Sequence, residues 1–201
     1  RPDLTVMEQK FNLLLAKFDS ATTASNQIEI LDEINVLRGD FQTSAAIASV
    51  RNSINTTDAY YEAEQEFFDM NEPVLKDLNF KLYKALGSSK YREELKLKFG
   101  NQLFNLADVS LKTFDTSIIE DLKEENKLGT EYTKLVASAE IEFNGQKLTL
   151  SALSAFMEST DRAVRKKAYE ANQAFFASHE NQFDEIYDKL VKVRTKLHIN
   201  L

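Results

Sequence analysis

The chain has 201 residues, with 32 Asp and Glu against 25 Lys and Arg, for a formal net charge of −7. An acidic surface repels nucleic-acid phosphates and anionic lipid, so nucleic acid and membrane are disfavoured as partners. The lack of cysteine excludes a disulfide framework and a thiolate nucleophile, and it suits a reducing compartment. Five glycines and two prolines are few, which is typical of a chain made mostly of helices.

Two further patterns bound the class of protein. No run of eighteen apolar residues occurs, so no membrane-spanning helix is expected. No basic stretch followed by an apolar run opens the chain, so no signal peptide is predicted, and Arg1 in place of Met indicates a trimmed N-terminus.

Apolar residues at helical spacing predict the first two helices. Asp3 is the expected N-cap of the first, and a loop over residues 20–26 precedes the second, which ends near Ile54. Gly39 lies inside the second helix, where it costs about 1 kcal/mol relative to Ala, so we expect a packing contact there. The predicted core residues are Leu4, Met7, Phe11, Leu14 and Phe18, then Ile28, Leu31, Ile34, Leu37, Phe41, Ala45 and Ala48.

Capping residues and helix breakers divide the next stretch. The run Asn55-Thr56-Thr57-Asp58 predicts the start of a third helix, which Pro73 should break or kink near Asn71. Further helices are predicted to end at Gly87 and Gly100, to span 102–114, and to run from 115 or 116 to 136, with Gly129 as a candidate interruption. The expected core residues are Tyr60, Ala63, Phe67, Met70, Leu75, Leu78, Leu82, Leu86, Leu103, Leu106, Leu111, Ile119, Leu122, Tyr132 and Val136.

The period of the sequence changes from helical to alternating after residue 138. Apolar and polar residues alternate on both sides of Asn144-Gly145, which is the strongest short-range signal for a β-hairpin. A two-residue loop would pair Glu142 with Lys147 on one face and Ile141 with Leu148 on the other.

The last third of the chain predicts a short helix and then a long one. Thr149 is the expected cap of the short helix, and Ser159 that of a helix of more than thirty residues, with Asp161 in its first turn. No capping Gly closes the long helix, so we expect the chain to be severed inside an element. The apolar residues of the two helices are Leu150, Leu153, Phe156 and Met157, then Phe176, Phe183, Ile186, Leu190, Val193 and Leu197.

Taken together, these patterns predict a mainly α fold. It consists of a multi-helix array, one small β-hairpin at about 138–150, and a long C-terminal helix. We expect two domains: a helical N-terminal domain over 1–136, and a hairpin with the long helix over 137–201.

The nearest approach to a catalytic motif is His179-Glu180-Asn181-Gln182-Phe183. A zinc peptidase helix needs His-Glu-x-x-His, so that two imidazoles one turn apart share a metal. Phe183 occupies the second position, and His198 would lie about 28 Å further along a helix that rises 1.5 Å per residue. We therefore predict no catalytic, cofactor-binding or metal-binding residue in this chain.

Other charged groups are weaker candidates for chemistry. The adjacent pairs Glu93-Glu94 and Glu124-Glu125 point to different sides of a helix, so they are interpreted as solvated faces rather than acid/base dyads. The cluster of Arg162, Arg165, Lys166 and Lys167 could hold a phosphate, but a surface network of ion pairs with nearby acids is the favoured interpretation.

Several stretches of the chain form a recognisable series: Asn55–Asp58 with Tyr61 and Glu64–Phe68, Lys98–Gly100, Glu125–Leu128, Glu131–Leu135, Ile141–Gly145, Asp161–Ala171 and Asp184–Lys196. Each stretch alone is a weak signal because it has the sequence of an ordinary helix, whereas their order and spacing are specific. Together they resemble the N-terminal region of oligoendopeptidase F, a bacterial zinc metallopeptidase related to thimet oligopeptidase. The resemblance covers essentially the whole chain.

The resemblance implies a cytoplasmic, mostly helical hydrolase in which an N-terminal half and a catalytic half enclose a channel for oligopeptides. It implies that zinc and its ligands belong to the catalytic half, beyond residue 201. The chain would then be one wall of the channel and inactive alone, with oligopeptides and the catalytic half as partners. The alternative is a non-enzymatic helical module that binds a partner through its exposed apolar stripe.

Overall fold

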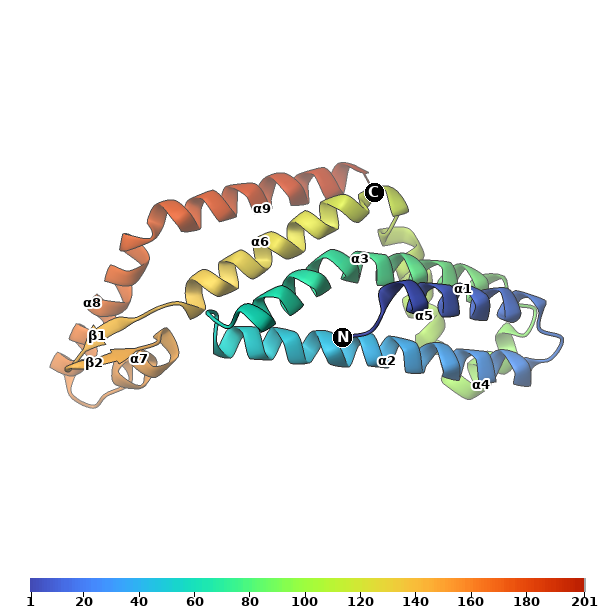
Figure 1. The fold of residues 1–201 in the computed structure, drawn as a ribbon, viewed down its shortest axis with the longest axis horizontal. Helices are drawn as coiled ribbons and strands as arrows, with labels where there is room; N and C mark the ends of the chain where they lie inside the picture. Colours follow the sequence, from blue (N-terminus) through green and yellow to red (C-terminus); the bar gives the residue numbers. More distant parts are fainter. Residues whose placement is uncertain (201) are drawn as a thin grey trace.

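The structure is a computed structural model that describes residues 1–200. These residues form an elongated array of helices with one β-hairpin at its far end (Figure 1), which confirms the predicted fold class. Within 1–200, no helix is both long and apolar enough to cross a membrane. The elements are α1 (Leu4–Ser20), α2 (Ala24–Ile54), α3 (Ala59–Ser88), α4 (Arg92–Phe99), α5 (Asn101–Thr113), η1 (Thr116–Ile118), α6 (Ile119–Ala137), β1 (Ile141–Phe143), β2 (Gln146–Leu148), α7 (Leu150–Met157), α8 (Arg162–Ser178) and α9 (Glu180–Asn200).

The first three helices begin at side chains that cap them. The Asp3 carboxylate accepts from Val6 N at 3.0 Å, and Asp58 accepts from the backbone of the first turn of α3. Thr23 caps α2, so the loop before this helix is shorter than predicted. These caps satisfy amides that have no partner within the helix.

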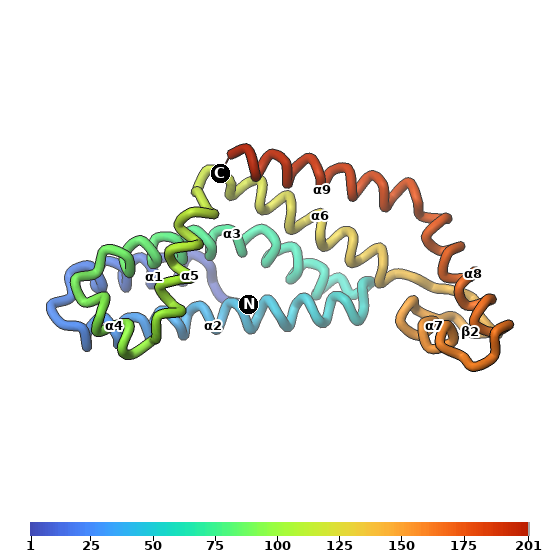
Figure 2. Tube along the Cα trace, turned by 180° about the vertical axis from the view of Figure 1, so that it is seen from behind, coloured from blue at the N-terminus to red at the C-terminus, as the bar shows by residue number. Residues whose placement is uncertain are grey.

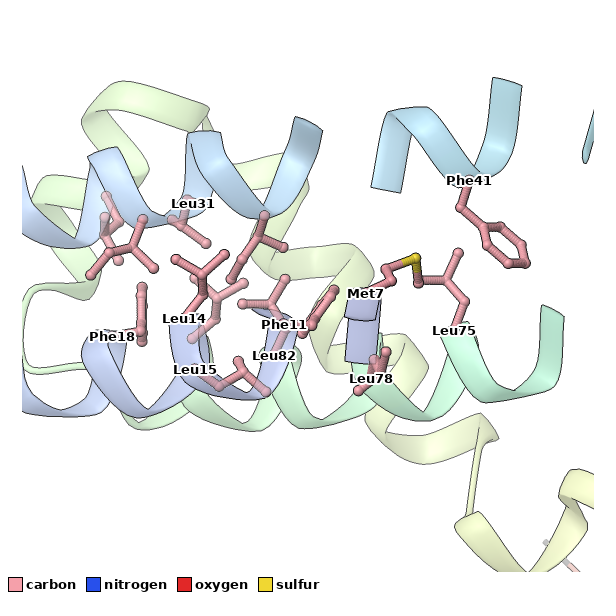
Figure 3. Packing of buried hydrophobic residues seen from close by; sticks show 14 of the residues in the cluster. Met7, Phe11, Leu14, Leu15, Phe18, Leu31, Phe41, Leu75, Leu78 and Leu82 are labelled. Atoms are coloured by element: carbon pink, nitrogen blue, oxygen red, sulfur yellow. The ribbon is translucent and has the colours of Figure 1, made fainter. Parts of the chain in front are cut away.

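The larger core lies between α1, α2 and α3 and is covered by α4 and α5. We call it the bundle core. Figure 3 shows Met7, Phe11, Leu14 and Phe18 of α1 facing leucines of α2 and α3. The stripe predicted for α1 is confirmed, because all of its central residues are buried. The buried members are Met7, Phe11, Leu14, Leu15, Phe18, Ile30, Leu31, Ile34, Phe41, Ala48, Phe68, Leu75, Leu78, Leu82, Leu86, Leu95 and Phe104.

A second, smaller core forms where the hairpin packs against α7 and α8. We call it the hairpin core, and Figure 2 shows that its elements lie beyond the bundle. The register is as predicted: Ile141 faces Leu148, and Glu142 faces Lys147. Its turn, Asn144-Gly145, has positive φ at both residues, as a tight hairpin requires. The buried members are Ala139, Ile141, Phe143, Leu153, Ala168 and Phe175.

One ion pair of the hairpin differs from the prediction. Lys147 Nζ lies 2.8 Å from the carboxylate of Glu140, not from that of its cross-strand partner Glu142. This hydrogen bond and the opposite charge lower the pKa of Glu140 and raise that of Lys147. Both side chains are exposed, so the pair contributes little to stability.

The prediction of one unbroken helix from about residue 160 to the end of the chain is wrong in two respects. Asp161, not Ser159, is the N-cap, since its carboxylate accepts from Ala163 N. The helix also breaks at His179, where the backbone leaves helical geometry. In a continuous helix, His179 N would donate to Phe175 O. Here His179 N bonds Phe176 O instead, and the ring Nδ1 of His179 lies 2.9 Å from Phe175 O. The break lets α9 turn back and run beside α6 (Figure 1).

Pro73 bends α3 but does not end it, so the two helices predicted on either side of it are one. A proline has no amide hydrogen, and Pro73 therefore leaves the carbonyl of Asp69 without its helical partner. The side chain of Asn126, on α6, donates to Asp69 O at 3.1 Å in its place. A neighbouring helix thus stabilises the bend, which Figure 1 shows midway along α3.

The buried faces of two helices differ from the prediction. In α5 the buried residues are Phe104 and Ala107, while Leu106 is 52% exposed. In α3, Tyr60 and Met70 are exposed and Phe68 is buried. Gly129 does not interrupt α6. Each helix offers more than one apolar stripe, and the position of its neighbours selects the one that is buried.

No neighbouring atom requires a glycine at position 39, contrary to the packing contact predicted there. A Cβ built at this position would meet no atom within 4 Å. We therefore expect Gly39→Ala to raise the free energy of unfolding by about 0.5–1 kcal/mol, because alanine loses less backbone entropy in a helix. Urea denaturation measures the change, and a variant no more stable than the parent would contradict it.

Candidate functional site

A polar groove runs along the middle of the array, between α2 and α3, and α6 and α9 also line one part of it. Its two parts have volumes of about 420 and 430 Å³. Both parts are lined by Ser49, Gln65, Asp69 and Glu72, which makes them one continuous feature. The part next to α6 and α9 is completed by Asn52, Ser53, Glu125, Asn126, Gly129, Thr130, Thr133 and Arg194, and the other by Phe41, Gln42, Ala45, Ala46, Phe68, Leu75, Lys76 and Asn79.

Asp69 lies at the centre of the polar groove, where the two parts meet. Its residue is only 9% exposed, and its carboxylate accepts from Gln65 Nε2 at 2.8 Å. Burial raises the pKa of the Asp69 carboxyl above its usual value, the charges of Glu72 and Glu66 add to this, and hydrogen bonds from Thr130 and Gln65 oppose it. Asp69 therefore holds its negative charge at a cost in folding free energy.

This cost gives a pH-dependent prediction for Asp69→Asn. A carboxyl whose pKa is raised in the folded state contributes most stability below its unfolded pKa and loses it as pH rises through the folded pKa. We therefore expect the variant to match the parent near pH 3.5 and to become more stable as pH rises towards 7. Each kcal/mol gained should raise the melting temperature by about 2–4 °C.

Thermal melts of the two proteins across this pH range measure the difference. Asp32→Asn is the matched control, because Asp32 is an exposed residue on α2 with no ion pair among the described residues. A variant that is less stable than the parent at neutral pH would contradict the prediction.

Unpartnered polar atoms gather in the polar groove. Within residues 1–200, four buried side-chain polar atoms have no hydrogen-bond partner, and three of them belong to groove residues: Asn52 Oδ1, Gln65 Oε1 and Asn79 Oδ1. Buried polar atoms are almost always paired in folded proteins. Three buried carbonyl oxygens of groove-lining residues therefore have no donor within the described part of the chain.

The other charged side chains of the groove are paired with one another. Arg194 Nε, from α9, donates to Glu125 Oε1 at 2.7 Å, and Lys76 Nζ lies 3.7 Å from Glu72. Asn126 links α6 to the bend in α3 through Asp69 O. Among the described residues of the groove, these pairs leave Asp69 as the carboxylate without a cation.

A second cavity, of about 390 Å³, lies where α3, α5 and α6 approach the end of α9, and it is mostly apolar. Phe80, Tyr83, Phe114, Ile118 and Leu197 are among its lining residues. Lys76, Asn79, Ser110 and Thr113 also line it, so a few polar groups surround a mainly apolar surface.

Comparison with known protein families assigns the chain. A family model described as the peptidase M3 N-terminal domain matches residues 1–114, more than half of the sequence. The chain belongs to this family. The polar groove thus lies in a peptidase M3 N-terminal domain and, through Glu125, Asn126 and Arg194, extends beyond the matched segment.

The chain is also similar to solved structures over 98–100% of its length. It is 50% identical to PZ peptidase A, solved with an inhibitor, over 98% of this chain and 35% of that one, with a TM-score of 0.93. It is 46% identical to a protein assigned as oligoendopeptidase F, over 100% of this chain and 35% of that one, and 45% identical to another from Bacillus anthracis str. Ames, over 100% and 37%; both TM-scores are 0.95. The chain described here spans about a third of the length of the proteins in these structures. The comparison with curated proteins found no match.

Neither histidine of the chain lines the polar groove. His179 Nδ1 lies 3.0 Å from Ser178 Oγ, and its ring packs on Phe175 in the hairpin core. His198 is exposed on α9. In residues 1–200 no group of three His, Cys, Asp or Glu side chains could hold a metal, so the described residues do not fit a zinc site.

The basic cluster is partly engaged in local structure. Arg165 Nη1 donates to the carbonyls of Ser159 and Thr160, at 2.6 and 3.0 Å, and so stabilises the turn before α8. Lys166 pairs with Glu170 at 3.6 Å. The network therefore includes backbone carbonyls as well as the acids that the sequence suggested.

The central residues of the polar groove were not predicted from the sequence. Gln65 and Asp69 stand one turn apart in a helix that was expected to bury other residues, and Glu125 was interpreted as a solvated acid. The only signal in the sequence was Pro73, since a proline inside a helix leaves the carbonyl of the fourth residue before it, here Asp69, in need of an outside partner.

Proposed function

We propose that this chain is the N-terminal part of an oligopeptide-cleaving zinc metalloendopeptidase of the oligoendopeptidase F type. Its role is to form one wall of the channel that admits short peptides. The observation that carries this proposal is the 45–50% identity, over 98–100% of the chain, to PZ peptidase A and to two proteins assigned as oligoendopeptidase F. Identity at this level over a whole fold supports a shared role as well as a shared shape.

The remaining features of the proposal follow from the same likeness. We propose that zinc and its ligands are supplied by a catalytic portion of the same polypeptide, so that the chain has two partners: oligopeptides and that portion. We also propose a cytoplasmic location, which the lack of cysteine supports. The division into 1–136 and 137–201 remains a proposal, supported by the separate bundle core and hairpin core.

The test compares this chain with a longer product of its gene. We expect the 201-residue chain to bind no stoichiometric zinc and to leave a quenched fluorescent peptide intact. The longer product should contain one zinc per chain and cleave the peptide, with activity lost on chelation and restored by zinc. A longer product without zinc-dependent cleavage would overturn the proposal, as would zinc-dependent cleavage by the 201-residue chain alone.

A further inference from the structure

The polar groove contains a buried carboxylate without a cation. Three aspartates of the described chain are buried: Asp69, Asp77 and Asp121. Asp77 pairs with Lys81 at 2.7 Å, and Asp121 pairs with Lys196. Asp69 has no cation within ion-pair distance in residues 1–200, although a buried charge is costly unless it is paired.

The charges around Asp69 do not provide the missing partner. Lys76 and Arg194, the two cations that line the groove, already pair with Glu72 and Glu125. Gln65 donates one hydrogen bond to Asp69 but brings no charge. The groove therefore keeps one uncompensated negative charge, and a single cationic group would balance it.

Two uncharged residues that line the groove with Asp69 each have a side-chain oxygen without a hydrogen-bond partner. Asn52 is 7% exposed, lines the part of the groove next to α6 and α9, and its Oδ1 accepts no hydrogen bond from the described residues. Gln65 Oε1 is likewise free, as the other end of this amide is bonded to Asp69. Carbonyl oxygens around a carboxylate suit a ligand that carries positive charge and several N–H donors.

A guanidinium of the chain already pairs with one carboxylate of this groove. Arg194 reaches Glu125 from α9 in that manner. A metal ion would need more charged ligands, and no group of three is present within 1–200. From these observations we propose that the polar groove binds a cationic nitrogen group of a peptide, a guanidinium or an ammonium, on Asp69. Its peptide context rests on the proposed function, whereas the cation site rests on the groove alone.

Direct binding to the 201-residue chain tests the proposal. The probes are acetylated and amidated Ala-Arg-Ala and Ala-Lys-Ala, unblocked Ala-Ala-Ala amide, and acetylated and amidated Ala-citrulline-Ala, which has the shape of the arginine probe without its charge. Titrations at pH 7.5 and low salt are followed by nuclear magnetic resonance. We expect at least one cationic probe to bind about tenfold or more tightly than the citrulline probe, because a charged hydrogen bond is lost in the latter.

Three variants connect that binding to the groove. Asp69→Asn keeps the shape of the side chain, and we expect it to weaken the tightest cationic probe by about tenfold or more. Glu72→Gln should weaken it by a smaller factor, because Lys76 already offsets that charge. Asp32→Asn, the same chemical change outside the groove, should leave affinity within about twofold of the parent, as expected of a distant exposed charge. Circular dichroism confirms that each variant is folded.

The outcomes separate the sources of the cation and the two proposals. An arginine, lysine or amino-terminal preference that depends on Asp69 supports the site and identifies its ligand. The proposal would be overturned if no cationic probe bound more tightly than the citrulline probe, or if the binding of the tightest cationic probe were unchanged in Asp69→Asn. Asp69-dependent binding of Mg²⁺ or Ca²⁺ instead of any peptide probe would also overturn it. None of these results depends on peptidase activity, so a failure of the proposed function is recognised separately.

Discussion

Phe11→Ala is expected to lower the free energy of unfolding by about 3–5 kcal/mol, the usual cost of emptying a packed aromatic site. Phe11 is fully buried in the bundle core, where α1 faces α2 and α3 (Figure 3). The ring is surrounded by leucines held by three long helices, so the site cannot collapse around the smaller side chain. The loss therefore includes a cavity as well as the transfer free energy of the ring.

Urea denaturation measures the loss, and Leu13→Ala is its control on the same helix. Leu13 is an exposed residue, so its truncation should change the free energy of unfolding by no more than about 0.5 kcal/mol. Equal effects of the two substitutions would contradict the assignment of the buried face of α1.

Leu153→Ala is expected to cost about 2–5 kcal/mol within the hairpin core. Leu153 is the fully buried centre of the contact between α7, β1 and α8. That core is small and separate from the bundle core, so we expect its loss to appear as local opening before global unfolding. Amide hydrogen exchange should accelerate in β1, β2, α7 and α8, while protection in α1, α2 and the second half of α3 stays near that of the parent.

The same measurement tests the proposed division between residues 136 and 137. Exchange that rises equally in the two cores would mean that they unfold as one unit, and the division would fail. Leu97→Ala is the matched control, because Leu97 is 89% exposed on α4 and its truncation should alter neither core.

Local signals in the sequence predicted the helix starts and the hairpin well. Asp3, Asp58 and Thr149 cap their helices as expected, because a capping side chain bonds amides only two or three residues away. The register of the hairpin was equally local, since Asn144-Gly145 fixes a two-residue turn.

Predictions that depended on distant neighbours were less accurate. Pro73 was expected to break or kink the helix, and the structure has the kink, because Asn126, from another helix, bonds the carbonyl that the proline leaves free. The break at His179 had no proline or glycine to mark it, and the buried face of α5 is set by the helices around it rather than by its most apolar stripe.

The sequence by itself determined the helical class, the hairpin and the family. These depend on the spacing of apolar residues, on turn residues and on the order of motifs along the chain. Only the tertiary structure decided that Asp69 is buried without a cation, beside the free amide oxygens of Asn52 and Gln65. The physical reason is that the burial of a side chain and its ion pairs depend on residues distant in the sequence. Only when α2, α3, α6 and α9 come together is the Asp69 carboxylate buried while the nearby cations pair with other acids.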